Sequence, residues 1–313
     1  MVVLAAAGAL ASSGTAYVGA RNLLIGQAAK ARSVIPKSWD VPPRADGVYA
    51  PGGGPVQRWQ RGMSVDLHLM VFGDSTATGY GCRTAEEVPG VLIARGLAEQ
   101  SGKRVRLSTK AIVGATSKGL SGQVDAMFVT GPPPDAAVIL VGANDVTALN
   151  GIGASARRLG AAVRRLCASG AKVVVATCPD FGVVRAIPQP LRWTVRTLGL
   201  RLARAQSGAV SAAGGVPVPL ASLVNDEFRH SPHLMLSEDQ FHPSAAGYAL
   251  AASQLLPALC NALGEFDGEQ TPALPSSTAT EAGPGYPARR LFSRLWRRPT
   301  TGVPAPIVVA TPG

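Results

Sequence analysis

The middle of the chain alternates between short apolar runs and longer amphipathic stretches. Continuous apolar runs such as LHLMVFG and AKVVVATC are typical of strands that are buried on both faces of a parallel sheet. The pattern predicts strands at residues 67–73, 105–109, 136–142, 171–178 and 216–220, with helices near 84–100 and over 154–169. Alternating strands and helices predict a three-layer α/β/α sandwich.

Two helices carry further signals. The helix over 154–169 places four arginines on one side, which indicates a solvated face: Arg157, Arg158, Arg164 and Arg165. Near the end of the pattern, Pro243 is predicted to open a final helix, because proline is favoured at the first helical position.

The two ends of the chain differ from the middle. Residues 1–20 are almost free of charge, which predicts a signal peptide or a membrane anchor; a helix docked on the domain is the alternative. Residues 21–65 form a Pro/Gly-rich lead-in, and 66–263 form the folded domain. Residues 264–313 are rich in Pro, Gly, Ser, Thr and Ala and predict a disordered tail.

A basic amphipathic stretch at 289–298 interrupts that tail. Together with residues 2–20 it predicts association with a membrane or the cell envelope, although a solvated tail is the alternative. We therefore expect a cell-envelope or secreted protein, with a cytoplasmic one as the alternative.

Composition excludes several classes of function. Of the 313 residues 46% are hydrophobic and 16% charged, which supports a folded core. The net charge of +11 raises the question of nucleic acid, but the basic residues are dispersed, aromatic residues make up 5%, and no nucleic-acid-binding motif is present. Four cysteines occur without a C-x-x-C pair, so neither a disulfide scaffold nor a zinc ribbon is expected. We expect no metal and no cofactor.

Four polar blocks follow or flank the predicted strands. They are Gly73-Asp74-Ser75-Thr76, Val113-Gly114-Ala115-Thr116, Gly142-Ala143-Asn144-Asp145 and Asp239-Gln240-Phe241-His242. Reactive groups of an open α/β sheet lie at the carboxyl ends of its strands, so we expect these blocks to meet there.

Their chemistry is that of a serine hydrolase. Ser75 needs a base to become a nucleophile, and His242 is a candidate for that base. Asp239 is close enough in the chain to orient the imidazole and to stabilise its protonated form. The backbone N–H groups of Ser75 and Gly114, with the side-chain amide of Asn144, are candidates for an oxyanion hole.

These blocks resemble those of the SGNH hydrolases, also called the GDSL esterase/lipase family, and occur in the family's order across roughly residues 66–263. The first block reads GDST where the longer family form reads GDSL. Residues 2–65 resemble the anchor and lead-in of actinobacterial members. The resemblance implies a mostly parallel, flavodoxin-like sandwich, a triad of Ser75, His242 and Asp239, and ester hydrolysis without a metal.

We therefore expect a serine esterase that acts on a small-molecule or lipid ester with a short or medium acyl chain. An acyltransferase or deacetylase acting on a cell-envelope glycan is the first alternative, and a non-catalytic envelope-binding module is the second. The complete set of nucleophile, base and oxyanion donors argues against mere binding.

Several polar residues near these blocks have structural interpretations. We expect Asp74 and Asp145 to hydrogen-bond neighbouring loops, and His68 to be a structural histidine within its strand. His230 and His233 form an H-x-x-H pair, for which a metal site is the alternative to a structural role.

Overall fold

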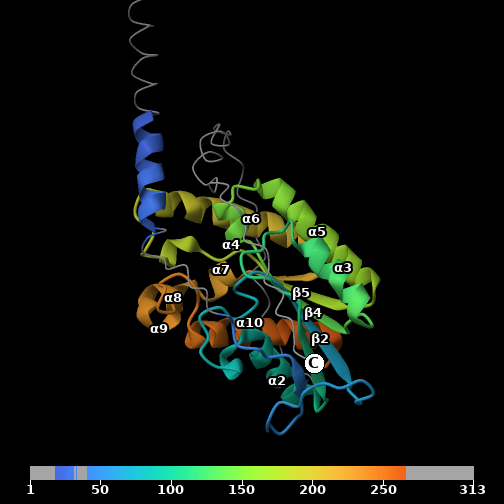
Figure 1. Ribbon diagram of the computed structural model, residues 1–313. Helices are drawn as coiled ribbons and strands as arrows, with labels where there is room; N and C mark the ends of the chain where they lie inside the picture. Colours follow the sequence, from blue (N-terminus) through green and yellow to red (C-terminus); the bar gives the residue numbers. More distant parts are fainter. Residues whose placement is uncertain (1–17, 32, 34–40, 266–313) are drawn as a thin grey trace, which may run out of the picture.

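Six strands form one sheet, in the order β1-β3-β2-β4-β5-β6 (Figure 1). The computed structural model describes residues 18–31, 33 and 41–265. The strands are β1 (Gly47–Tyr49), β2 (Leu67–Gly73), β3 (Val105–Thr109), β4 (Ala136–Leu140), β5 (Lys172–Ala176) and β6 (Val216–Val218). Strands β2 to β6 pair in parallel, and β1 pairs antiparallel with β3.

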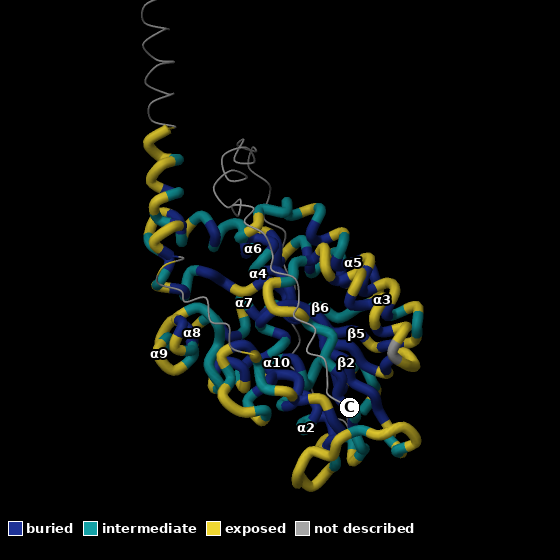
Figure 2. Tube along the Cα trace, in the orientation of Figure 1, coloured by how far each residue is buried: buried dark blue, intermediate teal, exposed yellow. Residues whose placement is uncertain are grey.

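Side chains of each central strand alternate between two apolar layers. In β2, Leu69 and Val71 face one layer, and Met70 and Phe72 face the other. Both sets are buried, and the trace of β2 is dark blue in Figure 2. This explains why β2 is apolar without interruption.

Helices cover both faces of the sheet. On one face lie α2 (Pro89–Ser101) and α10 (Ala245–Leu263), and on the other lie α3 (Leu120–Thr130), α5 (Ile152–Ala168) and α6 (Leu191–Ser211). Shorter helices lie in the loops: η1 (Ala85–Glu87), α4 (Ala143–Thr147), η2 (Phe181–Val183), α7 (Leu220–Leu223), α8 (Asn225–His230) and α9 (Pro232–Met235). The predicted three-layer, mostly parallel sandwich is confirmed.

The strand order also positions the site. Setting β1 aside, the chain passes from β2 to β3 on one side and then to β4 on the other. This is the flavodoxin-like order, in which ligands bind beyond the carboxyl ends of the strands where the winding reverses. Ser75 follows β2, the strand at that reversal.

The prediction that Pro243 opens the last helix is wrong. Helix α10 begins at Ala245, and Ser244 is its N-cap residue, whose hydroxyl accepts a hydrogen bond from the N–H of Gly247. Pro243 lies before the helix and forms an isolated bridge with Leu236. The capping hydroxyl therefore determines the start of this helix.

The predicted lead-in, residues 21–65, contributes more than an extended connection. Residues 18–31 are helical and dock through Leu24, Ala28 and Ala31, and β1 extends the sheet. No helix among the described residues has the length and hydropathy needed to cross a bilayer. The predicted segment 1–20 lies mostly outside the described residues, and the predicted tail, including 289–298, does so except for its first two residues.

Candidate active site

The turn after β2 presents Ser75. Gly73 has φ of +134°, and a Cβ atom there would lie 1.9 Å from the carbonyl oxygen of Leu140, so the position requires glycine. The N–H of Asp74 donates to that same carbonyl at 3.0 Å, and the N–H of Tyr80 donates to the carbonyl of Ser75 at 3.0 Å. Neighbouring backbone thus holds the serine at the carboxyl edge of the sheet.

Ser75, His242 and Asp239 form one continuous hydrogen-bonded chain. His242 Nε2 lies 2.9 Å from Ser75 Oγ, although 167 residues separate the two in sequence. His242 Nδ1 lies 2.5 Å from Asp239 Oδ2. The structure therefore brings together the three residues that the sequence assigned to a triad.

The other carboxylate oxygen of Asp239 organises its own loop. Asp239 Oδ1 accepts hydrogen bonds from Ser237 Oγ at 2.8 Å, from the N–H of Phe241 at 2.9 Å and from the N–H of His242 at 2.8 Å. One carboxylate both folds the loop and orients the imidazole on it.

Two aromatic rings confine the imidazole. The Tyr80 ring centre lies 4.4 Å from that of His242, and the Phe241 ring meets the imidazole edge-on at 5.1 Å. No pattern in the sequence predicted a role for either residue. Phe241 lies inside the fourth polar block, but nothing in the sequence around Tyr80 points to His242.

The candidate oxyanion donors lie on two connected loops. Gly114 has φ of +79°, in the loop after β3, and the N–H of Ile112 from that loop donates to the carbonyl of Gly73 at 3.1 Å. Asn144, on α4 after β4, donates from Nδ2 to the carbonyl of Ala115 at 2.9 Å. The Gly114 loop is thus tied both to the nucleophile turn and to Asn144.

Asp145 also holds the Gly114 loop in place. Its buried carboxylate accepts hydrogen bonds from the N–H and the Oγ of Ser117, both at 2.7 Å, and from Ser155 Oγ at 2.8 Å. The prediction that Asp145 hydrogen-bonds a neighbouring loop is confirmed.

Residues 71–250 match the GDSL-like Lipase/Acylhydrolase family. The chain belongs to this family. The predicted family resemblance is therefore confirmed, and the span matched contains all four polar blocks.

This GDSL hydrolase also resembles individual proteins. It is 66% identical over 307 residues to the GDSL-like esterase Rv1075c of Mycobacterium tuberculosis, covering 97% of each chain. Among solved structures it resembles the lipase/acylhydrolase from Enterococcus faecalis, with a TM-score of 0.51 and 21% identity. That match covers 66% of this chain and all of the other, and it supports the fold.

At the GDSL site, the surroundings of Asp239 and Asp74 shift the pKa values of the two carboxyl groups. Burial acts to raise the pKa of Asp239, but the hydrogen bonds and charge of His242 outweigh it and lower the pKa to about 2. Asp74 is fully buried, and desolvation raises its pKa to about 6 despite the hydrogen bond from the N–H of Thr76. Asp239 is therefore ionised at neutral pH, and its negative carboxylate can orient the imidazole of His242.

The remaining histidines of the GDSL hydrolase lie apart from this chemistry. His68 Nε2 lies 2.9 Å from Ser108 Oγ, and burial lowers its pKa to about 4, so the predicted structural role is confirmed. His230 and His233 lie on the separate helices α8 and α9. Within the described part of the chain, no three His, Cys, Asp or Glu residues are grouped as a metal site.

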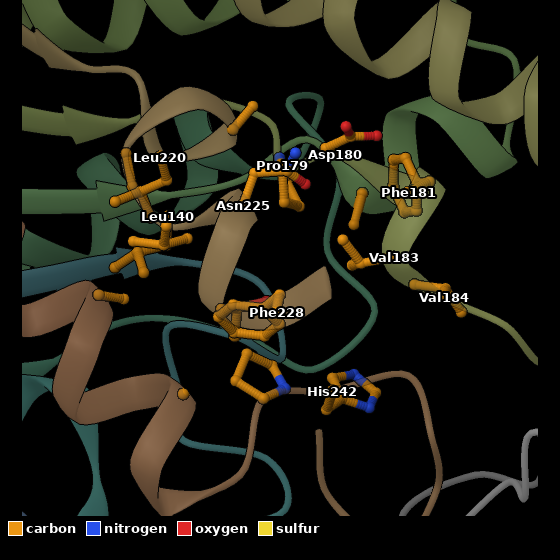
Figure 3. A pocket seen from close by; sticks show the side chains of 18 of the residues that line it. Leu140, Pro179, Asp180, Phe181, Val183, Val184, Leu220, Asn225, Phe228 and His242 are labelled. Carbon is orange, nitrogen blue, oxygen red and sulfur yellow. The ribbon is translucent and has the colours of Figure 1, made fainter. Parts of the chain in front are cut away.

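An apolar cavity of about 110 Å³ adjoins His242 in this GDSL hydrolase (Figure 3). Its walls come from the ends of β4 and β5, from η2 and from α7, α8 and α10. Its apolar lining includes Leu140, Phe181, Val183, Leu220, Val224 and Phe228. The cavity offers an apolar ligand a place directly beside the candidate base.

Two buried glutamines support the site, and no pattern in the sequence predicted their role. The Gln123 amide binds both backbone groups of Gly73, each at 2.8 Å. The Gln206 amide accepts from the N–H of Cys178 at 2.7 Å and donates to the carbonyl of Val141 at 2.9 Å. Both satisfy backbone groups at strand ends, where the sheet ladder stops.

Proposed function

We propose that this GDSL hydrolase cleaves carboxylic esters with short to medium acyl chains through an acyl-enzyme on Ser75. Family membership supports ester hydrolysis in general. The observation that carries the finer proposal is the Ser75–His242–Asp239 hydrogen-bond chain beside an apolar cavity.

The reaction follows from the geometry. His242 Nε2 accepts the proton of Ser75 Oγ as that oxygen attacks the ester carbonyl. Asp239 stabilises the imidazolium that forms, and the imidazolium then protonates the departing alcohol. Water repeats the sequence on the acyl-enzyme, which releases the carboxylic acid and restores the serine.

The tetrahedral intermediate carries a negative oxygen that needs fixed donors. Within the described residues, the N–H groups of Ser75 and Gly114 donate to no protein acceptor. Asn144 uses one Nδ2 hydrogen on Ala115, and an amide has two such hydrogens, so the second is free for the substrate. These three donors form the proposed oxyanion hole.

The apolar cavity is the proposed acyl site. Its lining is mainly aliphatic and aromatic, and burial of methylene groups against such walls contributes about 0.8 kcal/mol for each group. The cavity is small, which favours acyl chains of short to medium length.

Replacement of the nucleophile tests the mechanism. Ser75→Ala should lower kcat by about 10⁴-fold or more, because Ser75 carries the hydroxyl that His242 activates to form the acyl-enzyme. The melting temperature should stay unchanged. The matched control is Ser222→Ala on α7, where the serine is exposed and outside the site, and it should keep full activity. Hydrolysis by Ser75→Ala within a few-fold of the unsubstituted enzyme would refute the serine mechanism.

A chain-length series tests the acyl site. We expect p-nitrophenyl acetate, butyrate and octanoate to be hydrolysed faster than the palmitate ester. Ala221→Leu, at a residue lining the cavity, should shift the preference towards acetate, whereas the neighbouring Ser222→Leu should not. Fastest hydrolysis of palmitate would show that the acyl chain binds elsewhere.

A further inference from the structure

A second cavity, of about 430 Å³, lies next to the acyl cavity. The two share Val183 and Phe228 as walls. Four arginines line the second cavity: Arg185, Arg192, Arg196 and Arg229. It is therefore a basic cavity at the edge of an apolar one.

Most of this positive charge has no counter-ion. Arg196 pairs with Asp180 at 3.0 Å. Within the described part of the chain, Arg185, Arg192 and Arg229 form no ion pair, and no carboxylate lines the cavity. Guanidinium groups bind phosphate oxygens in a forked geometry, so a cavity lined by four arginines suits a phosphate-bearing ligand.

Helix α6, whose first turns line the cavity, is basic as well. It carries four arginines and contains neither Asp nor Glu. Of these, Arg201 and Arg204 on α6 are exposed. Trp193, which also lines the cavity, is 62% exposed, and tryptophan favours the interface between water and lipid headgroups. Arginine with exposed tryptophan is a combination suited to an anionic bilayer.

The amino-terminal helix adjoins this surface. Gln27 Oε1 accepts a hydrogen bond from the N–H of Leu191 at 2.9 Å, at the start of α6. Leu24 and Ala28 belong to the same apolar cluster as Leu191. The helix stands out from the domain and becomes exposed towards residue 18 (Figures 1 and 2). In the sequence, residues 2–17 before it carry no charge.

We propose that the surface formed by the basic cavity, Trp193 and the first turn of α6 docks on an anionic phospholipid bilayer. Arg185, Arg192 and Arg229 bind lipid phosphate groups, and Trp193 lies at the level of the headgroups. Docking does not depend on the proposed ester hydrolysis. The consequence of docking for catalysis does rest on that proposed function: because the two cavities share Val183 and Phe228 as walls, docking places the acyl cavity beside the membrane surface.

Vesicle sedimentation of the full chain tests this docking. The chain should bind vesicles of phosphatidylglycerol and phosphatidylcholine more tightly than vesicles of phosphatidylcholine alone, and salt should weaken the binding. Each basic residue at an anionic surface changes the partition coefficient about fivefold. Arg192→Gln with Arg229→Gln should therefore weaken binding about 25-fold. Trp193→Ala should weaken it further.

A matched double variant separates this surface from total charge. Arg58 and Arg61 are exposed in the loop before β2, at the opposite end of the molecule in Figure 1. Arg58→Gln with Arg61→Gln removes the same charge, and we expect its binding to stay within about twofold of the unsubstituted chain. An equal loss in both double variants would overturn the proposal, because binding would then follow net charge.

Two further results bear on the proposal. If the Arg192/Arg229 variant binds vesicles normally but loses inorganic phosphate in calorimetry, the cavity takes a soluble anion and the docking is refuted. Hydrolysis of p-nitrophenyl butyrate in solution should be equal in all variants. If neither the unsubstituted chain nor any variant hydrolyses this ester, the proposed function is contradicted, but the vesicle-binding result still tests the docking.

Discussion

Asp239 performs two tasks with its two carboxylate oxygens. One oxygen holds the imidazole of His242, and the other accepts three hydrogen bonds from its own loop. An amide in its place keeps one acceptor but loses the negative charge. Substitution at this residue therefore separates orientation of the imidazole from stabilisation of its charge.

Asp239→Asn should lower kcat by up to about 10⁴-fold, because the amide favours the wrong imidazole tautomer and leaves the imidazolium unstabilised. Steady-state kinetics on a short ester measures the effect. Glu238→Gln, at an exposed neighbour, is the control and should leave kcat unchanged. Equal kcat values for both variants would show that Asp239 takes no part in the reaction.

Asn144→Ala tests the oxyanion hole. The hydrogen bond to the substrate oxygen strengthens as negative charge develops, so kcat should fall by about 10²–10³-fold with little change in KM. A raised KM with unchanged kcat would instead assign Asn144 to ground-state binding. Thr147→Ala on the same short helix is a control for helix integrity.

Asp74 should make stability depend on pH in an unusual direction. Its pKa is about 6 in the folded protein and 3.8 when unperturbed, so the unfolded state loses its proton first as pH rises. The Asp74 contribution to the free energy of unfolding therefore falls between about pH 4 and 6. Asp74→Asn removes this pH-dependent contribution. The free energy of unfolding of the variant, relative to that of the unsubstituted protein, should therefore rise from pH 4 to pH 6 by as much as about 3 kcal/mol. Denaturant unfolding at both pH values measures the difference, and parallel profiles would refute the assignment.

Among the secondary-structure elements, the carboxyl ends of the strands need hydrogen-bond partners from outside the sheet. The ladder satisfies the backbone within each strand, but at its carboxyl end the chain turns away to build the site. Gln123 on α3 and Gln206 on α6 reach across from the helical layer and bind the backbone groups left there. Two helices thereby fix where the catalytic loops begin.

Gln123→Met should cost about 1–3 kcal/mol of stability, because it leaves the N–H of Gly73 without a partner inside the protein, whereas the carbonyl of Gly73 keeps the N–H of Ile112. Gln60→Met in the exposed loop before β2 is the control and should change stability by less than about 0.5 kcal/mol. Urea unfolding monitored by circular dichroism compares the two. Equal, small effects would mean that Gly73 finds other partners.

At the scale of the whole molecule, the site draws on elements from β2 to the start of α10. All of its residues lie between Gly73 and Ala251. Helix α10 closes the domain, with Leu255 and Leu259 fully buried against the sheet.

Deletion of residues 270–313 should therefore leave kcat/KM for a soluble ester within about twofold, since α10 is intact. Deletion from residue 255 onwards removes the buried leucines and should unfold the domain, because each contributes about 2–5 kcal/mol. Loss of activity in a folded 270–313 deletion variant would show that the tail contributes to the site.

The layers, the strand runs and the four polar blocks could all be predicted from the sequence. Each of these is a local property, because burial on both faces makes a strand continuously apolar and the chemistry sits directly after it. Even so, the local pattern placed Pro243 in a helix that Ser244 begins, and it treated residues 21–65 as a connection although β1 joins the sheet.

Which side chains meet at the site depends on tertiary packing. Tyr80 packs on His242, and Gln123 binds Gly73 from 50 residues away, through contacts that leave no spacing to detect in the chain. The acyl cavity and the basic cavity likewise draw their walls from several separate elements. Burial and charge at such places depend on packing between distant segments, and no periodicity within one segment encodes them.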